Sequence, residues 1–173
     1  MADVRSFPPV AAPGARVLIL GSMPGRASLD AGRYYAHPHN AFWPIVGELI
    51  GFSPELPYLA RLQALQAAGV ALWDVIAACE REGSLDADIV AGSVRANDFP
   101  AFFTAHPGIR DVFFNGAAAE QAFRRHALPA LAATGLRLQR LPSTSPAHAA
   151  LNRAAKLAAW SAILKPLTGG EGV

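Results

Sequence analysis

Short apolar runs alternate along the chain with longer segments that repeat hydrophobic residues at helical spacing. Apolar runs that end at glycine or a polar residue predict buried strands. We expect strands over 16–21, 70–75, 109–115 and 136–141, and helices over 40–51, 56–68, 97–105, 116–127 and 148–164. The segments 21–39 and 79–96 contain glycines and polar residues without a clear period, so they predict loops, and 168–173 predicts a loose tail.

This order of elements predicts the fold class. Strands that alternate with helices form parallel sheets, and strands buried on both faces are apolar throughout, as three of these four are. We therefore expect an α/β fold, a three-layer αβα sandwich with a mainly parallel four-stranded sheet. The sequence has no internal repeat and no linker, so we expect a single domain over residues 1–173.

Polar or Gly/Pro-rich residues follow each predicted strand. In open α/β sheets, ligands bind beyond the carboxyl ends of the strands, so these positions predict a site. Each position also has a structural explanation, such as turn glycines, a helix cap by Asn115, or a cap of the last helix by one of Ser143–Ser145. The strand-end residues are Gly21–Gly25, Asp74, Asn115–Gly116 and Pro142–His148. They match no P-loop, dinucleotide-binding or esterase motif.

The segment Arg33–Trp43 is unusually rich in aromatic residues. Four aromatic residues and two histidines surround Asn40. Aromatic faces beside amide groups suit a flipped nucleobase, which needs stacking on its ring and hydrogen bonds on its edge. Phe42 and Trp43 begin a predicted helix and can equally serve the core. Asn40 is also a suitable N-cap for that helix.

Composition narrows the function classes. Of 173 residues, 52% are hydrophobic and 16% charged, which is typical of a globular protein. A lone cysteine, Cys79, excludes an internal disulfide framework and is expected in the core. The net charge is only +2, yet eight Lys/Arg face two acidic residues between Phe99 and Lys165. That basic half can follow a phosphate backbone, or it can be a set of solvated Arg-rich faces.

The sequence contains no apolar run of the roughly 20 residues that a membrane span needs, and the N-terminus lacks a signal-peptide pattern. We therefore expect a cytoplasmic protein without a membrane partner. We also expect a monomer.

Five motifs, in this order, resemble the uracil-DNA glycosylase superfamily over residues 12–165. They are GSMPG at 21–25, YYAHPHNAFW at 34–43, LWDV at 72–75, FNG at 114–116 and LPSTSP at 141–146. Within the superfamily the chain looks most like the hypoxanthine-DNA glycosylases, also called DNA-deoxyinosine glycosylases. It is also similar to the mismatch-specific uracil/thymine glycosylases.

Met23 separates these two groups. It stands where the mismatch-specific enzymes carry a catalytic asparagine, and the aspartate of classical uracil glycosylases is absent from this motif too. The hypoxanthine family places its catalytic asparagine in the second motif, which is Asn40 here. The resemblance therefore implies a DNA repair glycosylase that cuts the N-glycosidic bond of a flipped deaminated base, with hypoxanthine as the expected base.

The resemblance also implies residue roles. Asn40 would hold the attacking water, Tyr35 would stack on the base and Asn115 would read the base edge. Ser22, Met23, Ser143 and His148 complete the expected base site. The expected contacts to single- or double-stranded DNA come from Arg140, Ser143, Thr144, Ser145 and Arg153. No lysine lies in a motif, so we expect a monofunctional enzyme, with no cofactor and no metal.

Three alternatives remain open at this point. The chain could be a uracil or mismatch-specific DNA glycosylase, a nucleic-acid-binding domain that has lost catalysis, or a hydrolase of small nucleosides.

Overall fold

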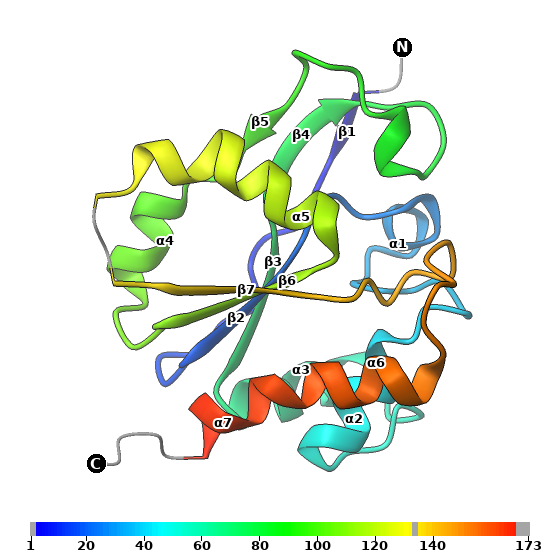
Figure 1. The fold of residues 1–173 in the computed structure, drawn as a ribbon, viewed down its shortest axis with the longest axis vertical. Helices are drawn as coiled ribbons and strands as arrows, with labels where there is room; N and C mark the ends of the chain where they lie inside the picture. The colour runs from blue at the N-terminus through cyan, green and yellow to red at the C-terminus, as the bar shows by residue number, and fades with distance from the viewer. Residues whose placement is uncertain (1–2, 133–134, 169–173) are drawn as a thin grey trace.

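The computed structural model describes residues 3–132 and 135–168. Four parallel strands form one sheet in the order β3-β2-β6-β7, with helices on both faces (Figure 1). The strands are β2 (Val17–Gly21), β3 (Val70–Asp74), β6 (Asp111–Asn115) and β7 (Arg137–Leu141). The predicted α/β fold and all four predicted strands are confirmed.

The helices divide between the two faces of this sheet. Figure 1 shows α4 (Phe99–Ala105) and α5 (Ala117–Ala122) on one face. The other face carries α2 (Phe42–Ile50), α3 (Tyr58–Ala67), α6 (Arg153–Trp160) and α7 (Leu164–Leu167). The short helix α1 (Arg26–Ala31) follows the carboxyl end of β2. Beyond α5 the chain continues as a π-helical turn over Phe123–Ala127.

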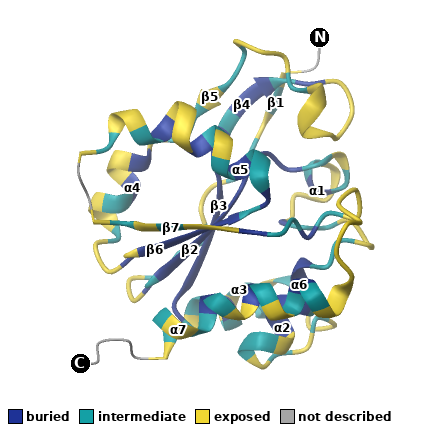
Figure 2. Ribbon diagram, in the orientation of Figure 1, coloured by how far each residue is buried: buried dark blue, intermediate teal, exposed yellow. Residues whose placement is uncertain are grey.

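Two hydrophobic clusters hold the layers together. Successive residues of a strand point to opposite faces, so Leu18 and Leu20 join the cluster under α4 and α5. Val17 and Ile19 join the cluster under the other helices, which includes Trp160. Every residue of β2 and β3 is buried, whereas the outer faces of the helices are exposed (Figure 2). Burial on both faces explains why these strands read as continuous apolar runs.

A second, antiparallel sheet lies above the carboxyl side of β3. It consists of β1 (Asp3–Arg5), β4 (Ile76–Glu80) and β5 (Arg95–Ala96), in the order β1-β4-β5. A 3-10 helix, Asp86–Asp88, lies between β4 and β5. The loop predicted over 79–96 is therefore wrong in part. These strands are short, and their pairing partners are far away in the sequence, so the local pattern gives little signal.

Several predicted helix boundaries are also wrong. The loop predicted over 21–39 contains α1. The last helix begins at Arg153 rather than at His148, because the side chain of Asn152 caps it by accepting a hydrogen bond from the amide of Ala155. This also excludes a cap by Ser143–Ser145. The residue before α2 is Ala41, not Asn40. Except for Thr168, the predicted tail lies outside the described residues.

No helix in the described part of the chain is long and apolar enough to span a membrane.

Candidate active site

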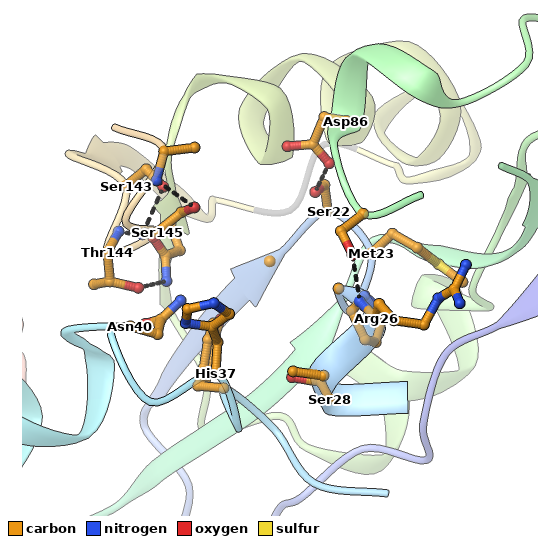
Figure 3. A pocket seen from close by; sticks show the side chains of 18 of the residues that line it. Ser22, Met23, Arg26, Ser28, His37, Asn40, Asp86, Ser143, Thr144 and Ser145 are labelled. Atoms are coloured by element: carbon orange, nitrogen blue, oxygen red, sulfur yellow. Dashed lines mark hydrogen bonds between the residues drawn. The ribbon is translucent and has the colours of Figure 1, made fainter. Parts of the chain in front are cut away.

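A cavity of about 290 Å³ opens at the carboxyl ends of the parallel strands. Its wall combines the chain after β2, the segment before α2, the end of β6 and the loop after β7 (Figure 3). The lining residues that were predicted from the sequence are Ser22, Met23, Tyr35, Asn40, Asn115, Ser143, Thr144 and Ser145. The structure thus brings eight predicted site residues to one cavity, from positions up to 123 residues apart in the chain.

Asn40 lies on the rim between the aromatic segment and α2. Its Oδ1 accepts a hydrogen bond of 2.9 Å from the backbone amide of Phe42, in the first turn of α2. That contact fixes which end of the side chain is the carbonyl. The neighbouring residue, Ala41, donates its backbone amide to the carbonyl of Thr144 at 3.0 Å, so α2 and the loop after β7 meet at Asn40. A carbonyl oxygen has a second lone pair, which can still accept a hydrogen bond from water.

The two tyrosines of the aromatic segment differ in their surroundings. Tyr34 is buried and donates its hydroxyl to the carbonyl of Pro8 at 2.9 Å, so it belongs mainly to the core, although it also contributes to the cavity lining. Tyr35 lines the cavity, and Phe42 stacks on one face of its ring with centroids 4.0 Å apart. Only the opposite face of Tyr35 is left for a base. Stacking of a base on Tyr35 therefore stays a prediction.

Tyr35 is held in an unusual backbone conformation. It is the one non-glycine residue with positive φ in the described part of the chain, at 54°. Residues other than glycine adopt this region rarely, and such strain persists where neighbouring contacts enforce it. Here the amide of Tyr34 donates to the hydroxyl of Tyr58, and the amide of Ala36 donates to Oγ of Ser28, both at 3.0 Å. These two hydrogen bonds thus hold the backbone of Tyr35 in the conformation that places its side chain in the cavity wall.

Asp74, at the end of β3, lines the cavity beside Gly21 of β2. Its side chain is 3% exposed, and its Oδ2 has no hydrogen-bond partner among the described residues. Burial, followed by the charge of Asp86, raises the pKa of Asp74 to about 7, and Arg81 opposes this shift. The sequence placed Asp74 at a strand end but assigned it no role. A buried carboxyl without a partner is a signal that only the folded chain provides.

Asn115 closes the opposite side of the cavity by holding the loop after β7. Its Nδ2 donates to Oγ1 of Thr144, and its Oδ1 accepts from the amide of Thr144, both at 2.9 Å. Thr144 is 1% exposed, and Ser143 packs against Gly116, whose φ is 94°. Asn115 is thus a structural anchor of the loop, and the second hydrogen of its amide group, which Thr144 does not use, is available to the neighbouring Tyr35 hydroxyl or to a ligand.

The chain between β4 and β5 covers a third side. Oγ of Ser22 donates to Oδ1 of Asp86 at 2.5 Å, and the amide of Arg26 donates to Oγ of Ser84 at 2.8 Å. Figure 3 shows Ser22 and Asp86 facing the Ser143–Ser145 loop across the cavity. Met23 also lines the cavity, and most of its side chain packs into the core.

Three predicted residues lie outside the cavity lining. His148 is exposed, and its carbonyl accepts a hydrogen bond from Nζ of Lys156 at 2.7 Å. Arg153 is exposed in the first turn of α6. Arg140 is exposed but lies 3.4 Å from Glu120.

Ion pairs reduce the positive charge that the basic half presents. Glu120 also pairs with Arg124, and Arg137 forms a two-point contact with Asp111. The two acidic residues of this half thus pair with Arg124, Arg137 and Arg140, while the excess of Lys/Arg over acidic residues in this half remains. Among the described residues, no group of three His, Cys, Asp or Glu side chains could hold a metal ion.

Comparison with known proteins gives one consistent family. The sequence profile of the uracil DNA glycosylase superfamily matches residues 8–167. A hypoxanthine DNA glycosylase of Methanosarcina acetivorans is 34% identical over 162 residues, which cover 93% of this chain and 98% of that protein. A hypoxanthine DNA glycosylase of Methanosarcina barkeri is 39% identical over 113 residues, or 65% of this chain and 70% of that protein.

A solved structure agrees with these sequences. The solution NMR structure of a candidate uracil DNA glycosylase from Methanosarcina acetivorans superposes with a TM-score of 0.80 at 33% identity. The match covers 96% of this chain and 99% of the other.

Proposed function

The chain belongs to the uracil DNA glycosylase superfamily, and we propose that it removes hypoxanthine from DNA by hydrolysing the N-glycosidic bond of deoxyinosine. The observation that carries this proposal is Asn40, whose oriented side-chain oxygen lies on the rim of a base-sized cavity at the carboxyl edge of the sheet. The curated relatives named above support hypoxanthine as the base.

The reaction needs a water molecule aimed at C1′ of the deoxyribose. The bond between C1′ and the base nitrogen breaks through an oxocarbenium-like state, and its electron pair leaves with the base. Water then supplies the new oxygen on C1′ and, in total, one proton to the base. Oδ1 of Asn40 is held by Phe42 and orients this water with its second lone pair. An amide is not a base at neutral pH, so Asn40 positions the water and does not deprotonate it.

The departing base carries negative charge, which hydrogen-bond donors in a preorganised site stabilise. Hypoxanthine and uracil leave more readily than adenine or cytosine because a carbonyl oxygen accepts part of that charge. The donors proposed for this role are the remaining amide hydrogen of Asn115, the hydroxyl of Ser143 and backbone amides near Ser22 and Met23. One such donor contributes roughly a 100-fold rate increase.

The proposed enzyme is monofunctional. A lyase step needs an amine that attacks C1′, and no lysine is among the described residues that line the cavity. The proposed product is an abasic site that alkali converts into a strand break.

A panel of oligonucleotides tests the substrate. We expect release of hypoxanthine from single-turnover reactions with inosine-containing duplexes, opposite several bases, and weaker or no release of uracil. Strand cleavage should require alkali. Robust uracil release without inosine activity would select the uracil or mismatch-specific alternative. Binding of these duplexes without base release would select the non-catalytic alternative, and release of hypoxanthine from free inosine alone would select a nucleoside hydrolase.

A further inference from the structure

The buried side chains of Asp74 and Tyr35 meet above Gly21 in the wall of the proposed base pocket. Oδ2 of Asp74 is buried without a hydrogen-bond partner among the described residues, and the buried hydroxyl of Tyr35 has only the nearby side-chain amide of Asn115, with no hydrogen bond of regular geometry. A methyl group built on Gly21 would lie 2.5 Å from Oδ1 of Asp74 and 3.2 Å from the Tyr35 hydroxyl oxygen. The carboxyl and the phenol therefore converge on the same small area above Gly21, and all three residues line the cavity.

This arrangement costs stability unless something pairs with it. A buried polar atom without a partner has lost its hydrogen bonds to water without replacement, and native proteins contain few of them. Tyr35 adds a backbone at φ 54°, which Tyr58 and Ser28 stabilise through hydrogen bonds to the residues on either side. Polar groups without regular hydrogen bonds and backbone strain at one place in a cavity are typical of a ligand site.

The two groups differ in what they offer. Above its pKa of about 7, Asp74 is a carboxylate, which only accepts hydrogen bonds, and a tyrosine hydroxyl can donate one. An acceptor beside a donor matches the lactam edge of a deaminated base, where a ring N–H stands next to a carbonyl oxygen. Adenine presents the reverse order, with an acceptor at N1 and a donor at N6.

We propose that Asp74 and the Tyr35 hydroxyl form a floor pair that recognises the lactam edge of the flipped base, with Asp74 accepting from the ring N–H and Tyr35 donating to the carbonyl oxygen. This inference rests on the proposed function and names what selects its substrate. It assigns specificity to the floor pair, whereas Asn115 mainly anchors the loop through Thr144. It also gives Tyr35 a role through its hydroxyl, in place of stacking through its ring.

Binding to non-cleavable duplexes tests the floor pair without requiring catalysis. Duplexes with 2′-fluoro-deoxyinosine carry the lactam edge, and duplexes with 2′-fluoro-deoxynebularine lack both the ring N–H and the carbonyl. We expect Tyr35→Phe to weaken binding to the inosine duplex about 10-fold and Asp74→Asn about 30-fold. Both variants should change binding to the nebularine duplex less than about 2-fold.

Two further comparisons distinguish recognition by the floor pair from a stacking role of Tyr35 and from a purely structural role. Tyr35→Phe preserves the ring, so a stacking role alone predicts no loss on either duplex, and that result overturns the hydroxyl assignment. Asp88→Asn, which removes an exposed carboxylate from the 3-10 helix outside the cavity lining, should bind both duplexes like the unaltered chain. Equal losses on the two duplexes for Asp74→Asn and Tyr35→Phe would show a structural role and overturn the floor pair.

The floor pair and the proposed function can be refuted independently of each other. An unaltered chain that releases no deaminated base refutes the proposed reaction, while the duplex preference still measures recognition by the floor pair. An unaltered chain that releases hypoxanthine, together with both variants keeping its full preference for inosine over nebularine, refutes the floor pair alone.

Discussion

Asn115 and Thr144 make two hydrogen bonds to each other, each 2.9 Å long, and this pair joins the end of β6 to the loop after β7. The same loop receives the amide of Ala41 through the carbonyl of Thr144. Three walls of the cavity therefore depend on one threonine. Asn115, which the resemblance implies as a reader of the base edge, is in the folded chain first an anchor for the loop after β7.

Removing this anchor should affect stability and binding together. Asn115→Ala leaves the buried amide and hydroxyl of Thr144 without partners, which should lower the free energy of unfolding by about 2–3 kcal/mol. Thr144→Val removes only the hydroxyl contact and should cost about 1 kcal/mol. Urea unfolding measures both. Thr104→Val, an exposed residue of α4, is the matched control and should lie within about 0.5 kcal/mol of the unaltered chain.

The sequence predicts the central sheet well because three of its four strands are buried on both faces. A buried strand such as Val17–Gly21 carries its own signal in a continuous apolar run, whereas the exposed β7 shows only in its alternation, and the strand order brings the polar ends together. The motifs of the resemblance then placed eight residues in one cavity. The β1-β4-β5 sheet carries no such signal, because a strand as short as Arg95–Ala96 depends on a partner about twenty residues away.

The local sequence also does not reveal the features of the site that depend on contacts between distant residues. Asp74 reads locally as a polar strand end, and its importance lies in the missing partner of Oδ2, which only the packing of β2, β3 and Tyr35 reveals. Arg140 and Arg137 read locally as free positive charge, yet Glu120 and Asp111 lie against them in the folded chain. The local sequence shows which residues are charged, but only the folded structure shows which distant residues neutralise those charges.

Asp74 should make stability depend on pH. Its pKa is about 7 in the folded chain, raised by burial from 3.8, so the folded state holds a proton that the unfolded state releases. The stability from this group is full below about pH 4 and is lost as the pH rises through about 7. Asp74→Asn should therefore gain stability relative to the unaltered chain between pH 4 and pH 8, by up to about 4 kcal/mol.

Urea unfolding at several pH values measures this difference. Asp88→Asn is the control, because an exposed carboxyl should give a pH-independent difference near zero. A constant gap between the unaltered chain and Asp74→Asn over this range would show that Asp74 stays charged in the folded state.

DNA affinity should fall with salt, and the exposed arginines should set the slope. Each phosphate contact that is lost reduces the slope of log K against log salt by about 0.9 for duplex DNA. Arg153→Gln should reduce the slope by about one contact for lesion and ordinary duplex alike. Arg140→Gln should have a smaller effect, because Glu120 already compensates its charge. Fluorescence anisotropy at 50–300 mM salt tests this, and an unchanged slope for Arg153→Gln would remove that residue from the DNA interface.

Asn40 allows the sharpest test, because its two possible roles predict different losses. As a structural residue, Asn40 accepts a hydrogen bond from the amide of Phe42, so Asn40→Ala should lower the free energy of unfolding by about 1 kcal/mol. As the residue that holds the attacking water, it should also lower the single-turnover rate on inosine-containing DNA at least about 100-fold, with DNA affinity little changed. Asn40→Asp keeps an oxygen that orients water and caps the turn, so part of the rate should return.

Asn152 provides a matched control for this substitution. Its side chain also accepts a hydrogen bond of 2.9 Å from a backbone amide at the start of a helix, but it lies outside the cavity lining. Asn152→Ala should therefore lose about the same stability and keep its cleavage rate at a temperature where both variants are folded. Equal cleavage rates for Asn40→Ala and Asn152→Ala would reduce Asn40 to a structural residue, and the water-holding role would then have to pass to another group of the cavity wall.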